Sequence, residues 1–319
     1  AIVGCGNIAG FLDHPKQDEI LTHAHAYQAH PNTQLVAVCD PDVVQRQGFT
    51  QVWGQEIRHY ESLSKLLEKH PIDMLSICSP TPHHATALIQ ALKDPNIRII
   101  LCEKPFVQTQ EELDELKILL PIHKKKVLIN YLRRFDPSIQ KIKLLLGSGD
   151  LGKVLHFTAK FTKGLYHNGS HMLELIEHLL GSITKLKALS MHNYQEDIYG
   201  HFFLSTPLCE GVIQNLHGDD YALFELEIIC SKGRVLIKDS AHHIEIQKVQ
   251  PSSRYQGYFE LGRTSQMDDT MQKNLYHSID YAIKNKQDSF PAHLALSQKL
   301  LDIKTHLETK NQLHWSSDA

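Results

Sequence analysis

The chain has no long apolar runs. None approaches the roughly 20 residues that a helix needs to cross a bilayer. There is no charged-then-apolar leader at its start, so we expect a cytoplasmic protein with no membrane partner. Ala1 already lies inside an expected strand, and we therefore expect further residues before it. The net charge of −3 provides no basic field for nucleic acid.

The chain also lacks the cysteine spacings of disulfide or zinc frameworks. None of its six cysteines is paired as CxxC, and four of them stand at the ends of apolar runs in the first half. This is typical of buried, reduced thiols. Histidine is abundant, at 22 residues. Its adjacent pairs, His83-His84 and His242-His243, point in different directions on a helix or strand, so we expect no metal site.

The first 130 residues alternate short β-branched runs with amphipathic stretches. We expect strands at 1–5, 34–40, 73–79, 97–103 and 126–131, with helices near 86–94 and 111–120. The strands are almost continuously apolar, as in a parallel sheet buried on both faces. Pro15 lies in the long first connection, where we expect an irregular loop before the helix. The alternation predicts a doubly wound α/β domain, here a Rossmann dinucleotide-binding domain at 1–131.

The pattern changes after Asp136-Pro137. A helix ending at Gly147 and Gly149 leads into strand-like runs separated by turn residues, which predict a large, open, mostly antiparallel sheet. One further helix is expected at 170–180, and two more at 267–286 and 292–310. The second α/β domain is expected at 132–319, with substrate bound between the two domains.

The opening segment AIVGCGNIAG fits a dinucleotide-binding turn. Gly4 permits the tight turn, Gly6 lets the backbone approach a pyrophosphate, and Ala9 lets the helix pack on the strand. Asp40 ends the second strand, where it can accept hydrogen bonds from the adenosine ribose and repel a 2′-phosphate. We therefore expect NAD rather than NADP. The alternative is that the Asp40-Pro41-Asp42 segment merely caps the next helix, and both roles are compatible.

Two loops follow later strands on the side where such sheets bind ligands. SPTPHH (79–84) is held extended by its prolines, and EKP (103–105) follows the next strand. The alternative for SPTP is a rigid loop without a ligand. The full expected set of cofactor-binding residues is Gly4, Gly6, Asn7, Ile8, Asp40, Ser79, Thr81, His84, Glu103 and Lys104.

Taken in order, these motifs carry a family likeness. The GxGxxA turn, the aspartate-ended second strand, SPTPHHA, EKP, RRFDP and HNGSHMLE resemble the Gfo/Idh/MocA oxidoreductases, which include glucose-fructose oxidoreductase and inositol dehydrogenase. The likeness spans nearly the whole chain, and EKP is its most specific element. It implies a Rossmann domain followed by an α/β domain that binds substrate and forms oligomers.

The resemblance also implies roles for individual residues. In the family, the lysine of EKP is catalytic and positions the substrate, which corresponds to Lys104. The family's His-x-x-Asp-x-x-x-His pattern corresponds to His171, Glu174 and His178, which lie on one helical face, with Glu in place of the commoner Asp. Glu174 and His178 would then assist proton transfer. His178 can instead pack locally near Gly181.

The substrate-binding residues that the resemblance implies are Lys104, Asn168, His171 and Glu174. Together these inferences predict an NAD(H)-dependent oxidoreductase that acts on a hydroxyl or keto carbon of a sugar, polyol or sugar derivative. We expect a homodimer or homotetramer. Two alternatives stay open: transient redox by NAD during elimination or glycosidic cleavage, and a nucleotide-sensing protein without turnover.

Overall fold

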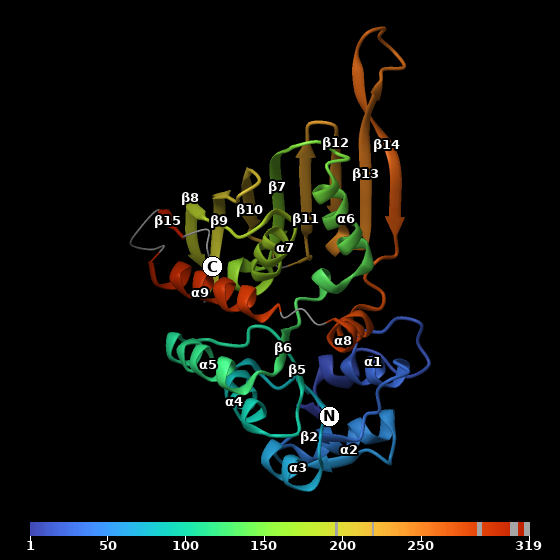
Figure 1. The fold of residues 1–319 in the computed structure, drawn as a ribbon, viewed down its shortest axis with the longest axis vertical. Helices are drawn as coiled ribbons and strands as arrows, with labels where there is room; N and C mark the ends of the chain where they lie inside the picture. Colours follow the sequence, from blue (N-terminus) through green and yellow to red (C-terminus); the bar gives the residue numbers. More distant parts are fainter. Residues whose placement is uncertain (195–196, 219, 286–288, 307–311, 316–319) are drawn as a thin grey trace. The chain divides into compact units, whose positions relative to one another are not determined.

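The computed structural model describes residues 1–194, 197–218, 220–285, 289–306 and 312–315. By compactness the chain divides into two units, one made of residues 1–135 and 272–301 and the other of residues 136–271 and 302–319. The functional division at residue 131 stays a prediction. Each unit contains its own sheet (Figure 1).

The first unit is built on a six-stranded parallel sheet in the order β3-β2-β1-β4-β5-β6. This order is that of a dinucleotide-binding doubly wound fold, as predicted. Its strands are β1 (Ile2–Val3), β2 (Ala37–Cys39), β3 (Arg58–Tyr60), β4 (Met74–Ile77), β5 (Ile99–Cys102) and β6 (Lys126–Ile129). The sequence did not predict β3, because this edge strand is too exposed to form an apolar run.

Helices follow the strands of this sheet. The α-helices are α1 (His23–Ala29), α2 (Val43–Trp53), α3 (Leu63–Lys69), α4 (His84–Lys93), α5 (Gln110–His123), α8 (Asn274–Lys284) and α9 (Phe290–His306), of which residues up to 301 belong to this unit. Shorter turns are η1 (Asn7–Phe11), η2 (Thr81–His83) and η3 (Leu132–Phe135). Helix α8 packs on α1, where His30 Nε2 lies 3.1 Å from Asp280 Oδ1.

The irregular segment expected before α1 is present and has a clear anchor. The Asp13 carboxylate accepts hydrogen bonds from the backbone of Leu21 and Thr22 and from the Thr22 hydroxyl. Thr22 in turn caps α1 by accepting from the backbone N–H of His25. Buried Asp13 therefore fixes the residue at which α1 begins.

The second unit is built on a nine-stranded sheet in the order β14-β13-β12-β11-β7-β10-β9-β8-β15. Its strands are β7 (Val154–Thr162), β8 (Lys185–Tyr194), β9 (Asp197–Ser205), β10 (Glu210–Leu216), β11 (Phe224–Cys230), β12 (Gly233–Lys238), β13 (His243–Pro251), β14 (Phe259–Asp268) and β15 (Gln312–His314). The prediction of a mostly antiparallel sheet is confirmed. Only the β7–β10 pair is parallel among the described strand pairs.

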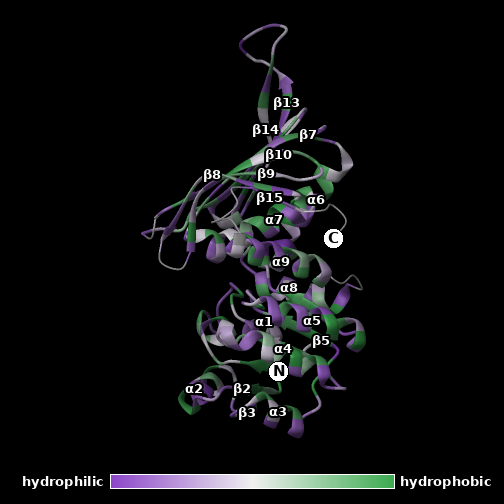
Figure 2. Cartoon of the chain, turned by 90° about the vertical axis from the view of Figure 1, so that its left-hand side faces the viewer, coloured by the Kyte–Doolittle hydropathy of each residue, from purple (hydrophilic) through white to green (hydrophobic). Residues whose placement is uncertain are grey.

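Helices α6 (Pro137–Ser148) and α7 (Ser170–Leu180) lie against one face of this sheet (Figure 1). Asp136 caps α6, which ends at Gly149 in the left-handed conformation, so the predicted stop is confirmed at Gly149 but Gly147 lies inside the helix. The turns η4 (Gly164–Gly169) and η5 (Asp239–Ala241) complete the unit. Polar and apolar residues alternate along α5 and α7 in Figure 2, as expected for helices with one buried face.

One helix prediction was wrong at its start. The sequence predicted a helix over 267–286, but β14 continues to Asp268 and α8 begins only at Asn274. Strand β14 was missed altogether, because its partly exposed hairpin with β13 lacks an apolar run. This hairpin extends beyond the neighbouring strands in Figure 1. The predicted helix at 292–310 is observed as α9, and residues 307–310 lie outside the described residues.

Five of the six cysteines are buried and all six are free thiols. Within the described ranges, no group of three or more histidine, cysteine, aspartate or glutamate side chains is arranged to hold a metal ion. Nor does any helix in the described part of the chain combine the length and apolar character that a membrane span requires.

Candidate functional site

The glycine turn joins β1 to η1, at the carboxyl end of the first strand. Gly4 has φ +86°, and a Cβ on it would lie 2.6 Å from the Ser79 backbone nitrogen. Gly6 differs, because a Cβ there would meet nothing within 4 Å. Asn7 is exposed and Ile8 is half-buried at the start of η1. Gly4 is therefore required by the fold, whereas the space beside Gly6 is open to a ligand.

The two glycines allow a matched test. We expect Gly4→Ala to destabilise the fold by at least about 2 kcal/mol, since it adds a backbone collision to an unfavourable φ. Gly6→Ala should keep the wild-type Tm but weaken NAD⁺ binding about tenfold or more, equivalent to about 1.4 kcal/mol. Thermal unfolding and calorimetric titration with NAD⁺ measure both. Unchanged NAD⁺ affinity in a folded Gly6→Ala protein would contradict the assignment of this turn.

Asp40 lies just past β2 and faces the glycine turn. Its Oδ2 accepts a hydrogen bond of 2.8 Å from the backbone N–H of Cys5, and its Oδ1 accepts one of 2.9 Å from that of Asp42. Asp42, rather than Asp40, caps α2 by accepting from the Val44 N–H. The Arg46 guanidinium donates to the carbonyl oxygen of Asp40. Asp40 therefore holds the glycine turn in place, and each of its carboxylate oxygens still has a lone pair for a ribose hydroxyl.

The SPTP loop follows β4. Thr81 opens η2 and is half-buried. The hydroxyl of Ser79 is buried and has no hydrogen-bond partner among the residues that the structure describes. The ring of His84 is buried, with Nδ1 2.7 Å from the Pro105 carbonyl oxygen and Nε2 2.5 Å from that of Ser79. His84, predicted to bind cofactor, thus connects the SPTP loop to the EKP loop, and a cofactor contact stays a prediction.

Replacing His84 tests this connection. We expect His84→Leu to destabilise the protein by about 1–3 kcal/mol, because at least one of the two carbonyl oxygens, of Ser79 or Pro105, loses its donor. His83→Leu is the matched control, because His83 is the exposed neighbour on the same turn. Urea unfolding of both variants measures the difference. Equal stability of the two variants would show that the loops are held together by other contacts.

Lys104 follows β5 and is half-buried. Burial lowers the pKa of Lys104, Glu103 opposes this shift, and the Arg133 charge adds to it. Burial on its own raises the pKa of Glu103, but hydrogen bonds from His23 and Asn130 and the charge of Lys104 outweigh it, so the pKa of Glu103 lies below its ordinary value. A carboxylate and an ammonium thus follow each other in the chain just past β5, and each affects the pKa of the other.

The residues around this edge fit a dinucleotide. The open space at Gly6, the buried Ser79 hydroxyl and the buried Asn130 Oδ1 all lie just past strand ends of the parallel sheet. Neither oxygen has a hydrogen-bond partner within the described part of the chain. Buried polar atoms in that state are costly unless a ligand or water satisfies them. Ligands of doubly wound sheets bind at this edge.

The second unit holds the other predicted group on α7. His171, Glu174 and His178 lie on one face of this helix, as predicted. Glu174 is only 2% exposed, whereas His171 and His178 are half-buried. His178 packs on α6, with Nε2 3.3 Å from Gln140 Nε2 and Nδ1 3.5 Å from Lys143 Nζ. The predicted roles of these three residues in substrate binding and proton transfer stay predictions.

Asn168 lies in η4, directly before α7. Its amide nitrogen donates to the carbonyl oxygens of Thr162 and Leu223 at 3.1 and 3.3 Å. Asp197 at the start of β9 accepts from the backbone N–H of Tyr166 and His167. These hydrogen bonds fix the turn from which α7 begins. The predicted substrate contact of Asn168 therefore depends on its amide oxygen.

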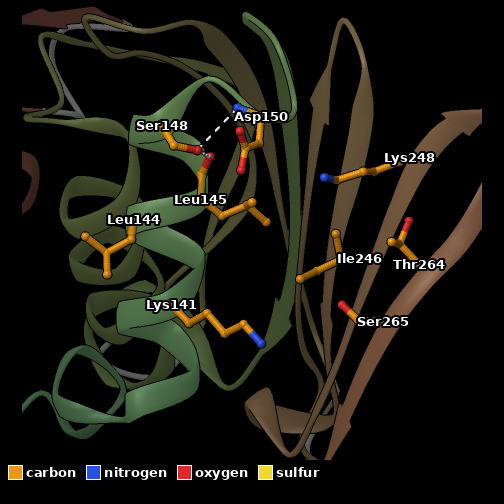
Figure 3. Close-up of a pocket in the computed structure, with 9 residues that line it drawn as sticks. All are labelled: Lys141, Leu144, Leu145, Ser148, Asp150, Ile246, Lys248, Thr264 and Ser265. Carbon is orange, nitrogen blue, oxygen red and sulfur yellow. Dashed lines mark hydrogen bonds between the residues drawn. The ribbon is translucent and has the colours of Figure 1, made fainter.

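A pocket of about 360 Å³ lies elsewhere in this unit, between α6 and strands β13 and β14 (Figure 3). None of the predicted site residues is among the nine that line it: Lys141, Leu144, Leu145, Ser148, Asp150, Ile246, Lys248, Thr264 and Ser265. This pocket is therefore separate from the predicted α7 group.

Sequence reasoning missed the buried polar groups behind Glu103. His23 Nε2 lies 2.9 Å from Glu103 Oε1, and Asn130 Nδ2 donates to the same oxygen at 2.6 Å. Ser76 Oγ lies 3.0 Å from His23 Nδ1 and 2.9 Å from the Tyr27 hydroxyl. One signal was present: Ser76 and Asn130 are lone polar residues in apolar strand runs, and such residues need a partner when buried.

The order of the parallel sheet and the glycine turn after its first strand define a dinucleotide-binding Rossmann unit. The comparisons agree with this class. Residues 1–131 match the family model described as "Oxidoreductase family, NAD-binding Rossmann fold". This is the Gfo/Idh/MocA family model, so the resemblance predicted from the sequence motifs is confirmed over these residues.

Curated relatives cover part of the chain. A D-glucoside 3-dehydrogenase of Escherichia coli is 26% identical over 215 residues, which cover 61% of this chain and 57% of that protein. An inositol 2-dehydrogenase of Rubrobacter xylanophilus is 28% identical over 160 residues, which cover 49% of this chain and 41% of that protein. The chain thus spans about half the length of the curated relatives it matches.

Solved structures show that the fold extends over the whole chain. An oxidoreductase from Agrobacterium radiobacter, crystallised with NAD⁺, L-tartaric acid and magnesium, aligns with a TM-score of 0.73 at 14% identity. The alignment covers 98% of this chain and 97% of that one. The predicted fold class of both units is therefore confirmed.

Proposed function

We propose that the protein is an NAD(H)-dependent oxidoreductase that acts on a hydroxyl or keto carbon of a sugar, polyol or sugar derivative. The observation that carries the proposal is the half-buried Lys104 beside ionised Glu103, at the strand edge of an NAD-binding family unit. The names of the curated relatives, a glucoside and an inositol dehydrogenase, support a carbohydrate-like substrate.

Several residues of this chain would hold the cofactor. The η1 backbone beside Gly6 would face the pyrophosphate, and Asp40 would accept from the adenosine ribose. A 2′-phosphate next to the Asp40 carboxylate would be repelled, which supports NAD rather than NADP. Ser79 Oγ and Asn130 Oδ1 are further polar contacts available at the same edge. Bound NAD(H) would supply the acceptor or donor of a hydride at its nicotinamide ring.

The protein side chains would handle the proton. Oxidation of a secondary alcohol to a ketone removes a hydride from carbon and a proton from oxygen. The Lys104 ammonium would donate a hydrogen bond to the reacting oxygen and stabilise its developing negative charge. The imidazole of His178 would accept the hydroxyl proton, and the Glu174 carboxylate would stabilise the imidazolium. In the reductive direction His178 would return that proton.

A substrate screen tests the proposal. The purified protein is mixed with NAD⁺ and a panel of inositols, glucosides, free sugars and sugar nucleotides, and NADH absorbance is followed. The reverse reaction is tested with NADH and the corresponding keto compounds. We expect turnover with at least one member of the panel. NAD⁺ binding without turnover on any member would favour the alternative of a nucleotide-sensing protein.

The oligomeric state also belongs to this proposal. Residues of β11 and β12 alternate between buried and half-exposed, so one face of the nine-stranded sheet retains partly exposed Ile229 and Leu236. A partly apolar sheet face of this kind suits contact with a second copy. A homodimer or homotetramer therefore remains our prediction.

A further inference from the structure

We propose that His23 is a positioning residue for Lys104, which acts by holding the half-buried carboxylate of the preceding residue, Glu103, ionised and fixed. This inference rests on the proposed function, because it assigns a partner to its central residue. His23 is the first residue of α1, lies in the glycine-turn half of the unit, and is 0% exposed. No motif that predicts cofactor or substrate binding includes it.

The hydrogen bond from His23 to Glu103 has a defined direction. An ionised carboxylate can only accept, so His23 Nε2 donates to Glu103 Oε1 over 2.9 Å. On the other side of the ring, Nδ1 lies 3.0 Å from Ser76 Oγ, and the Tyr27 hydroxyl lies 2.9 Å from the same oxygen. Nε2 therefore donates to Glu103, and Ser76 Oγ, which can both donate and accept, bridges Nδ1 and the Tyr27 hydroxyl.

Three elements hold this chain of donors in place. His23 and Tyr27 are four residues apart on α1 and therefore share a helical face, from which both reach Ser76 on β4. Burial raises the pKa of Tyr27, so its hydroxyl keeps its proton and remains a donor. Asn130, after β6, donates to Glu103 Oε1 from a different element. Glu103 is therefore bound by donors from two sides.

This arrangement matters because Glu103 precedes Lys104 directly. The carboxylate opposes the lowering of the Lys104 pKa that burial and Arg133 cause. The other titratable groups facing Glu103 are the thiols of Cys78 and Cys102, whose pKa values burial raises well above the ordinary value, so both are neutral. Glu103 is thus a negative charge that favours the ammonium form of Lys104.

The first readout is the titration of Glu103 itself. Protein labelled with ¹³C at the glutamate carboxyl is titrated by NMR, and the Glu103 resonance is assigned by its absence in Glu103→Gln. We expect the wild-type carboxylate to titrate below the ordinary range of glutamate. In His23→Leu, which removes the donor, the midpoint should rise by about one pH unit or more. His23→Gln retains an amide donor and should restore part of the shift.

A matched control separates this effect from a general loss of packing. His25 lies on the same helix and forms an equivalent buried contact, with Nδ1 2.9 Å from Asp13 Oδ2. His25→Leu should lower the Tm without moving the Glu103 titration. If His23→Leu fails to fold, Asn130→Ala removes the second donor from outside α1 and should raise the Glu103 midpoint in the same direction.

The second readout is catalytic. We measure kcat of His23→Leu and of wild type across a range of pH and divide the first by the second. Any pH-dependent loss of activity that both proteins share cancels in this ratio. We expect the ratio to fall as pH falls through the raised Glu103 value. An unshifted Glu103 titration and a flat ratio would overturn the inference. Activity that survives loss of Lys104 would instead overturn the proposed function, whatever the titration of Glu103 shows.

Discussion

Replacing Lys104 with methionine is expected to lower kcat by about 100- to 10,000-fold, a much larger loss than any change in NAD⁺ affinity. Methionine has a similar length but carries no charge and no donor for the reacting oxygen. The half-buried position of the lysine, beside Glu103, strengthens each of its electrostatic contacts. Steady-state kinetics on a substrate from the screen, together with calorimetric titration of NAD⁺, measures both quantities.

The pH dependence sharpens this prediction. Burial lowers the pKa of Lys104, and the ammonium is the active form, so activity is present below that pKa and is lost as the pH rises through it. The alkaline limb of wild type should therefore lie below the titration range of an ordinary lysine. Lys104→Arg keeps a cation at every accessible pH, so its residual activity should lack this limb. If Lys104→Met turned over substrate as fast as wild type, Lys104 would have no role in catalysis.

Replacing His178 with asparagine is the second large expected effect. We expect kcat to fall by about 100-fold or more, because asparagine cannot accept the hydroxyl proton. Glu174→Gln should also lower kcat, since the amide cannot stabilise an imidazolium. If the two residues act as one unit, the double variant should be scarcely worse than the His178 variant alone. Additive losses would show that they act separately.

Glu177 provides the matched control on the same helix. Its Oε1 accepts a 2.9 Å hydrogen bond from the backbone N–H of Ile183, which secures the end of α7. Glu177→Gln keeps an oxygen that can accept this hydrogen bond and should leave kcat near wild type. Loss of activity in this variant equal to that in Glu174→Gln would mean that the α7 changes act through helix packing rather than proton transfer.

The sequence predicted most strands of the parallel sheet because each of them is marked by its own run of apolar residues. Strands β1, β2, β4, β5 and β6 are buried on both faces, and continuous apolar runs mark them clearly. Strand β3 is an exposed edge, and β14 belongs to a hairpin that is partly exposed. Neither produces a run of apolar residues, so periodicity could not find them.

The parts of the candidate site that lie within one short turn or sequence motif could be predicted from the sequence. The glycine turn needs a positive φ at Gly4, a conformation that favours glycine, so the glycine in the sequence already predicts the turn. The partners of Glu103 come from positions 23 and 130, far apart in the chain, and only the sheet order brings them together. For the same reason the sequence did not predict that the ring nitrogens of His84 lie against the carbonyl oxygens of Ser79 and Pro105, and its cofactor contact stays a prediction.

The central claim is hydride transfer between NAD(H) and a carbohydrate-like alcohol. The most direct measurement uses the substrate found in the screen, deuterated at its reacting carbon, with mass spectrometry of the recovered cofactor. The account predicts that wild type produces NADH carrying one deuterium, and that Lys104→Met binds NAD⁺ but produces almost none. Product formed with unlabelled NADH, or with NAD⁺ unchanged at the end of each turnover, would contradict it.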